Sequence, residues 1–122
     1  MKNNYPDRYF LVIYFHHYLV DSVKGYLIQE NNEHIEIHRQ LIEFDGDLVE
    51  NENTEIQLSI PKEEFSEEST LRLFCLHEPK RSGGFDGRMR FLQSSIITEA
   101  EFNSILESED NRKDMIREKA KG

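Results

Sequence analysis

The first long apolar stretch of the chain has the pattern of a strand that is buried on both faces. From Tyr9 to Val20 almost every residue is aromatic or β-branched, without a helical stripe of polar positions. Twelve residues is long for one strand, so we expect a bulge near His16 and His17. The Asp-Ser pair at 21–22 then predicts a turn.

A hairpin of two strands is predicted next. Residues 23–30 form the first strand, and the asparagines at 31–32 form its turn, because asparagine tolerates positive φ. In the second strand, within residues 33–44, Ile35 and Ile37 alternate with polar residues. That alternation predicts one apolar face and one wet face.

Three further strands are expected beyond an acidic loop that turns at Asp45-Gly46. In "EIQLSIP", residues 55–61, every second residue is apolar and the final proline ends the strand. The run "TLRLFCLHE", residues 70–78, predicts a more fully buried strand, and "RMRFLQSSII", residues 88–97, predicts its partner. The segment 77–91 is therefore expected to be a β-hairpin with its tip between these two strands.

One helix is predicted after the last strand. Thr98 and Glu101 have the spacing of a capping box, in which each side chain satisfies a free backbone N–H at the start of a helix. Residues 107–114 contain no apolar side chain, so the helix becomes exposed there or breaks before Met115. Its apolar face consists of Phe102, Ile105 and Leu106.

About seven short strand candidates followed by a helix predict an α+β, β-rich fold. We expect mainly an antiparallel sheet, or a small β-sandwich, with one C-terminal helix. The length of 122 residues fits a single domain over 1–122, with flexible tails at 1–8 and 117–122.

The compartment is inferred from cysteine usage and from the N-terminus. Cys75 is the one cysteine, so it has no partner for an internal disulfide and is expected to pack as a small hydrophobe in a reducing compartment. The first apolar run is flanked by Asp7 and Arg8, lacks a cleavage site and is too short to span a membrane. These features predict a cytoplasmic protein without a membrane association.

Acidic residues are concentrated in the middle of the chain. The net charge is −9, and residues 30–68 hold thirteen Asp and Glu against one Arg and one Lys, a local balance of −11. Such a segment repels nucleic acid and attracts a basic protein, although acidic residues can also serve only to solubilise strands and loops. Mimicry of nucleic acid would require these carboxylates to converge on one face. The predicted partner-binding residues here are Asp45, Asp47, Glu50 and Glu52.

The segment 77–91 is unusual in being cationic and rich in glycine. Three of the six glycines lie in it, and they would let backbone N–H groups approach an anion. Phe85 lies in the middle of this polar segment with no evident core to fill, so we expect it to anchor a partner. The simpler alternative is a flexible hairpin tip whose cations offset nearby acidic strands. Its predicted basic contacts are Lys80, Arg81, Arg88 and Arg90.

The motifs of catalysis and metal binding are weak. His34 and His38 lie about 13 Å apart if they share a strand, too far to bind one metal. His77 is placed to act as a general acid or base, but no nucleophile is evidently paired with it. The acidic loop lacks the ligand spacing of a calcium loop, and the glycine-rich segment lacks a Walker A or dinucleotide motif. We therefore expect no catalytic residue, metal or cofactor.

These features favour a small cytoplasmic binding protein, of bacterial or phage type by size and composition. It would act on a basic protein partner as inhibitors, immunity proteins and nucleic-acid mimics do. One alternative is an enzyme that acts on a phosphorylated or nucleotide substrate through residues 77–91. Another is a structural subunit of a β-rich assembly, with the apolar first strand at an interface, and a homo-oligomer is left open.

Overall fold

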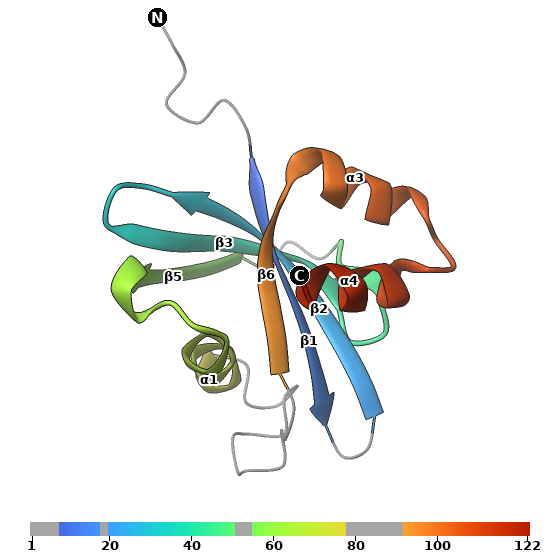
Figure 1. The fold of residues 1–122 in the computed structure, drawn as a ribbon, viewed down its shortest axis with the longest axis horizontal. Helices are drawn as coiled ribbons and strands as arrows, with labels where there is room; N and C mark the ends of the chain where they lie inside the picture. Colours follow the sequence, from blue (N-terminus) through green and yellow to red (C-terminus); the bar gives the residue numbers. More distant parts are fainter. Residues whose placement is uncertain (1–7, 18–19, 51–54, 78–91) are drawn as a thin grey trace, which may run out of the picture.

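The computed structural model describes residues 8–17, 20–50, 55–77 and 92–122. These residues form an antiparallel sheet of six strands, a short 3-10 helix and three α-helices, which confirms the α+β, β-rich class (Figure 1). The strands are β1 (Tyr9–His17), β2 (Val20–Glu30), β3 (His34–Glu43), β4 (Asp47–Leu48), β5 (Glu55–Pro61) and β6 (Leu92–Thr98). The helices are η2 (Lys62–Glu64), α1 (Glu67–His77), α3 (Glu99–Glu107) and α4 (Arg112–Ala120).

Strand β1 lies in the interior of the sheet, between β2 and β6. Beyond β2 comes β3, whose far side pairs with β4 near one end and with β5 along the rest. The chain thus runs through a meander of antiparallel strands and returns, after α1, to pair β6 with β1. This order makes β6 the edge of the sheet opposite β5.

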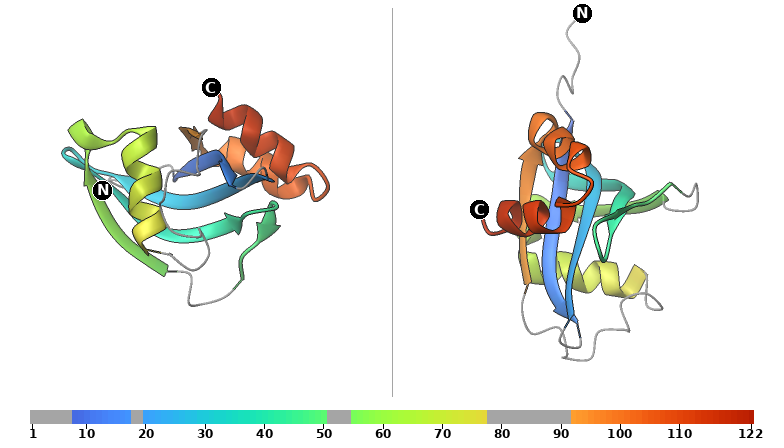
Figure 2. Two further views of the ribbon diagram at one scale, coloured as in Figure 1. Left: turned by 90° about the horizontal axis from the view of Figure 1, so that it is seen from below. Right: turned by 90° about the vertical axis from the view of Figure 1, so that its right-hand side faces the viewer.

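Side chains of β1 enter two separate cores, one on each face of the sheet. Leu11, Ile13 and Phe15 pack in a core that includes Leu71 of α1. Phe10 lies on the other face, where its ring stacks on Phe102 of α3 with centroids 4.0 Å apart. Figure 2 shows α1 on one side of the curved sheet and α3 and α4 on the other. The apolar first stretch is therefore buried on both faces, as its sequence predicts.

The prediction of a bulge near His16 and His17 is wrong. The register between β1 and β2 continues without a shift through the pair His17↔Val20, and residues 21–22 lie inside β2 rather than in a turn. The long apolar stretch divides between two strands, so no bulge is needed to shorten it. Register shifts occur instead between β2 and β3, at Gly25/Tyr26 and at Leu27/Ile28.

The prediction of a strand at 70–78 is also wrong, because residues 67–77 form α1. Ser66 caps this helix: its Oγ accepts a hydrogen bond from the Ser69 N–H at 3.2 Å. Leucine and arginine favour helices, and the run contains no β-branched residue after Thr70. Thr70 and Leu71 are buried while Arg72 is exposed, as expected at the start of an amphipathic helix.

The C-terminal region has two helices rather than one. The predicted capping box is present: Glu101 N–H donates to Thr98 Oγ1 at 3.3 Å, and Thr98 N–H donates to Glu101 Oε1 at 3.1 Å. Of the two alternatives for residues 107–114 the break is the correct one, since α3 ends at Glu107 and α4 begins at Arg112. Helix α4 continues to Ala120, which is buried, so the region expected as a tail is helical almost to its end.

Candidate functional site

The acidic residues of segment 30–68 that the structure describes lie mostly in two groups near opposite ends of β3, while Glu36 and Glu55 lie along the strands between them. One group follows β3, in the turn to β4, and the other surrounds the β2–β3 hairpin (Figure 1). The ten residues of β3 separate the two groups by about 30 Å at the usual rise of a strand. Among the described residues, the carboxylates of these two groups therefore do not converge on one surface.

Three of the predicted contacts lie in or near the turn between β3 and β4, and all three are exposed: Asp45 in the turn, Asp47 at the start of β4 and Glu50 just after β4. We call these residues the β3–β4 carboxylates. The predicted turn at Asp45-Gly46 is present, with φ of 89° at Gly46 and a hydrogen bond from Gly46 N–H to Glu43 O at 2.9 Å.

This turn packs against the first residues of α4. A Cβ on Gly46 would lie 3.0 Å from the backbone nitrogen of Lys113. Asp45 Oδ1 lies 3.8 Å from the Lys113 Nζ, and Arg112 also borders the turn. Of the β3–β4 carboxylates, Asp45 therefore lies beside a cation of its own chain, Lys113.

The β2–β3 hairpin is joined to η2 by backbone and side-chain contacts. Asn31 Oδ1 accepts hydrogen bonds from the N–H groups of Glu33 and His34, at 2.9 and 2.7 Å, which fixes the turn. Lys62 N–H donates to Glu33 O at 2.9 Å, and Lys62 Nζ lies 3.2 Å from Glu30 Oε2. The turn of the hairpin and the start of η2 therefore lie side by side.

Helix α1 begins directly beside η2. Ser69 Oγ donates a hydrogen bond to Glu64 O at 2.7 Å, which ties the two helices together. The acidic residues at the hairpin tip, in η2 and in the first turn of α1 thus lie at one end of the molecule. We call them the hairpin-end carboxylates: Glu30, Glu33, Glu63, Glu64, Glu67 and Glu68.

Few cations neutralise the hairpin-end carboxylates. Glu30 pairs with Lys62, and Glu68 pairs with Arg72 at 3.3 Å. Six carboxylates against these two cations leave a balance of −4. In the part of the chain that the structure describes, four of the six have no ion pair: Glu33, Glu63, Glu64 and Glu67. All four are exposed.

The other predicted contacts lie outside the described residues: Glu52, Lys80, Arg81, Phe85, Arg88 and Arg90. His77 is the last residue of α1. Because α1 replaces the strand expected before this segment, residues 78–91 connect a helix to β6, and the pair of strands on which the β-hairpin prediction rested does not form.

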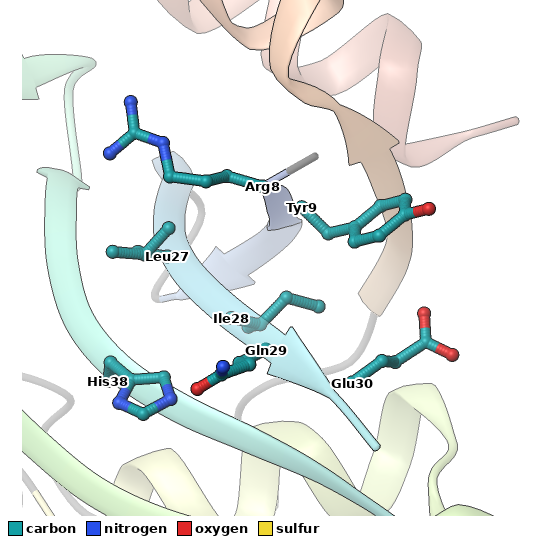
Figure 3. A pocket seen from close by; sticks show the side chains of 7 residues that line it. All are labelled: Arg8, Tyr9, Leu27, Ile28, Gln29, Glu30 and His38. Carbon is teal, nitrogen blue, oxygen red and sulfur yellow. The ribbon is translucent and has the colours of Figure 1, made fainter. Parts of the chain in front are cut away.

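A pocket of about 290 Å³ opens near the start of β1 and the end of β2 (Figure 3). Arg8 at its rim forms an ion pair with Glu99, with Nη2 2.6 Å from Glu99 Oε2, and this hydrogen bond lowers the pKa of the Glu99 carboxyl. The lining mixes apolar side chains with charges of both signs, so it does not select an anion over a cation. It consists of Arg8, Tyr9, Leu27, Ile28, Gln29, Glu30 and His38.

The histidines of β3 have the predicted alternation. Ile35 and Ile37 are buried, and the neighbouring His34 and His38 are half-buried. His38 Nε2 lies 3.7 Å from Glu36 Oε1, which gives an ion pair when the imidazole is protonated. Within residues 8–17, 20–50, 55–77 and 92–122, no group of three or more His, Cys, Asp or Glu side chains is arranged to hold a metal ion.

Comparison with known proteins gives no match: no family model, curated protein or solved structure is significantly similar to this chain. Among the helices in the described ranges, none has the length and apolar character needed to cross a membrane. The function is therefore argued from the residues and their arrangement alone.

Proposed function

We propose that this chain is a binding protein that recognises a protein with a basic surface through the hairpin-end carboxylates. The observation that carries the proposal is the gathering of six carboxylates from three segments, of which two have a cation partner among the described residues. The hairpin-end carboxylates belong to neither core, so the packing of the sheet does not require these side chains to be acidic. Their charge is available to a partner.

Physical chemistry supports a role of these charges in association. Exposed carboxylates contribute little to folding, whereas a concentrated field of one sign attracts an oppositely charged partner and raises the rate of encounter. It also disfavours nucleic acid, whose phosphates carry the same sign. The proposal therefore places the contact at the hairpin end, with a cytoplasmic basic protein as the partner.

Among the types of binding protein, the inhibitor or immunity type fits this arrangement better than the nucleic-acid mimic. A mimic needs carboxylates in a continuous array, and here β3 separates the two acidic groups by about 30 Å. A local acidic surface is sufficient for a protein that blocks a basic site.

No observation specifically favours the enzyme hypothesis or the structural-subunit hypothesis. The enzyme hypothesis depends on residues 78–91, which lie outside the described part of the chain. The structural-subunit hypothesis depends on an apolar first strand at an interface, but the side chains from Phe10 to Phe15 are buried within this chain. The apolar character of β1 is thus explained by its two cores.

The test compares two matched sets of neutral substitutions. One variant changes Glu33, Glu63 and Glu64 to Gln, and the control changes Asp45 and Asp47 to Asn and Glu50 to Gln. Each set removes three exposed carboxylates and keeps the side-chain shape close to the original. Wild type and both variants are used as bait in the native host's extract, and a partner retained by wild type is purified for measurement of association rates.

We expect the hairpin-end variant to slow association by about tenfold at low salt and the control to slow it much less. High salt should remove most of the difference, because it screens exposed charges. Equal slowing by the two variants would show that only net charge matters. Slowing by the control alone would move the contact to the β3–β4 turn and overturn the proposal.

A further inference from the structure

The pocket at the start of β1 and the end of β2 adjoins the hairpin-end carboxylates, because Glu30 belongs to both. Its rim is accessible: the side chains of Arg8, Glu30 and His38 are 59%, 35% and 36% exposed. The volume of about 290 Å³ lies at the lower limit for pockets that hold small molecules. The pocket therefore suits a single side chain better than a large cofactor.

Each charged side chain of the lining has a partner of opposite sign within this chain. Matched charges of this kind leave no field of one sign at the mouth of the pocket. The lining therefore attracts neither an anion nor a cation by charge alone. The pairs are Arg8 with Glu99 at 2.6 Å, Glu30 with Lys62 at 3.2 Å, and, when the imidazole is protonated, His38 with Glu36 at 3.7 Å.

The uncharged part of the lining is mainly apolar. Tyr9 and Leu27 are half-buried and Ile28 is buried, and Gln29 adds one neutral polar side chain. Figure 3 shows Leu27 and Ile28 in the middle of the lining, between Arg8 and His38. Apolar surface in a concave site gains free energy when another apolar group displaces the water from it. This lining therefore selects an uncharged apolar group.

We propose that this pocket binds one large apolar side chain of the basic protein that the hairpin-end carboxylates attract. The inference rests on the proposed function and adds specificity to it, because the partner must then present an apolar residue among basic ones. In protein interfaces a few apolar or aromatic side chains seated in pockets carry most of the binding free energy, whereas the charges around them guide the encounter. The pocket would supply the first element and the carboxylates the second.

The position of the pocket favours a side chain of that partner over a free small molecule. Lys62 connects the pocket to the acidic surface: its Nζ lies 3.2 Å from Glu30 Oε2 at the rim, and its N–H donates to Glu33 O in the hairpin turn. A typical interface covers about 800 Å² of each protein. A partner that binds at the hairpin end therefore also lies over the pocket, so one of its side chains is at hand to fill it.

The test uses the full chain and two basic peptides that differ in their central residue. One peptide has a phenylalanine with a pair of arginines on each side, and the other has an alanine in the same place. Binding is measured at low salt by fluorescence anisotropy of the labelled peptides. Wild type should bind the phenylalanine peptide about tenfold more tightly, because the pocket buries its ring. Gln29→Trp, which fills the pocket from a half-buried position, should abolish this preference.

The matched control is Gln57→Trp, the same substitution at an exposed position of β5 that does not line the pocket. It should keep the tenfold preference of wild type. The alanine peptide should bind Gln29→Trp as tightly as it binds wild type. That result shows that the variant is folded with its acidic surface intact, so a lost preference cannot be attributed to misfolding.

Changing Glu33, Glu63 and Glu64 to Gln separates this inference from the proposed function. The triple variant should weaken binding of both peptides equally and leave the preference unchanged. Equal binding of the two peptides by wild type, or a preference that survives Gln29→Trp, would overturn the inference, while weakening of both peptides by the triple variant would still support the proposed function. If the peptides bind equally and p-cresol binds saturably to wild type but not to Gln29→Trp, the pocket belongs to a small molecule instead.

Discussion

At one end of β3 the turn with Asp45 and Gly46 packs on the first residues of α4, whereas at the other end the hairpin-end carboxylates face solvent beside η2. Both ends come from the same acidic segment, and their side chains are of the same kind. At the β3–β4 end the chain supplies Arg112 and Lys113 as neighbours. At the hairpin end four carboxylates have no ion pair among the described residues.

This difference shows why a charge count along the sequence is a poor guide to a binding surface. The balance of −11 over residues 30–68 treats both ends as one feature. In three dimensions, Lys113 of α4 pairs with Asp45 at one end of β3, whereas Lys62 and Arg72 pair with Glu30 and Glu68 at the other end.

Gly46→Val should destabilise the fold by about 2 kcal/mol, because it combines an unfavourable left-handed backbone with a steric clash. The φ of Gly46 is 89°, and an added Cβ would lie 3.0 Å from the backbone nitrogen of Lys113. Denaturation by urea measures the change in the free energy of unfolding.

The control for this prediction is Gly122→Val. Gly122 also has a positive φ, of 93°, but no atom lies within 4 Å of its added Cβ. We expect no measurable loss of stability from it. If the two variants behaved alike, the packing of the β3–β4 turn on α4 would not be a constraint on the fold.

Like Asp45, Glu101 forms an ion pair with a lysine of α4: Glu101 Oε2 lies 2.9 Å from Lys119 Nζ. The hydrogen bond from Lys119 lowers the pKa of Glu101, with a further contribution from the backbone N–H of Thr98. A carboxyl whose pKa is lower in the folded state stabilises the fold fully above its unfolded pKa, and this stabilisation is lost as pH falls through the folded value.

We therefore expect Glu101→Gln to destabilise the fold by about 1 kcal/mol at neutral pH, because it weakens both the ion pair and the capping box. The difference from wild type should shrink as pH falls below about 4. Glu107→Gln, in the same helix but exposed and without an ion pair in the described part of the chain, is the control. A difference that is constant with pH would contradict the role of the ionised carboxyl.

Local patterns in the sequence predict the parts of this fold that depend on near neighbours. The alternation around Ile35 and Ile37, the strand at 55–61 and the capping box at Thr98 are all present in the structure. Helix α1 was missed because a short apolar run fits a buried strand or one side of a helix equally well. The residue that distinguishes a helix from a strand here is Ser66, whose side chain caps the start of α1 by accepting a hydrogen bond from the Ser69 N–H.

The hairpin end could not be predicted for a further reason. It requires that β5 pair with β3, so that Pro61 lies opposite His34 and η2 meets the hairpin turn. It also requires the helical state of residues 67–77, which places the glutamates of the first turn beside η2. Pairings between distant segments are not encoded in any local pattern. They bring Glu33 and Glu63 to one surface although thirty residues separate them in the sequence.

The smallest expected effect concerns stability at the two ends of β3. Changing Glu33, Glu63 and Glu64 to Gln should alter the free energy of unfolding by less than about 0.5 kcal/mol, since these exposed side chains have no ion pair within the described residues. Any change should be stabilising and should vanish in salt, because the substitutions relieve repulsion that salt already screens.

The matched change of Asp45, Asp47 and Glu50 should have the opposite sign. It removes the ion pair between Asp45 and Lys113, so we expect a loss of about 0.5 kcal/mol at low salt. Urea denaturation at low and high salt measures both variants without adding charge. If the hairpin-end variant proved the less stable of the two, its carboxylates would be holding the fold together, and the argument that they are available to a partner would fail.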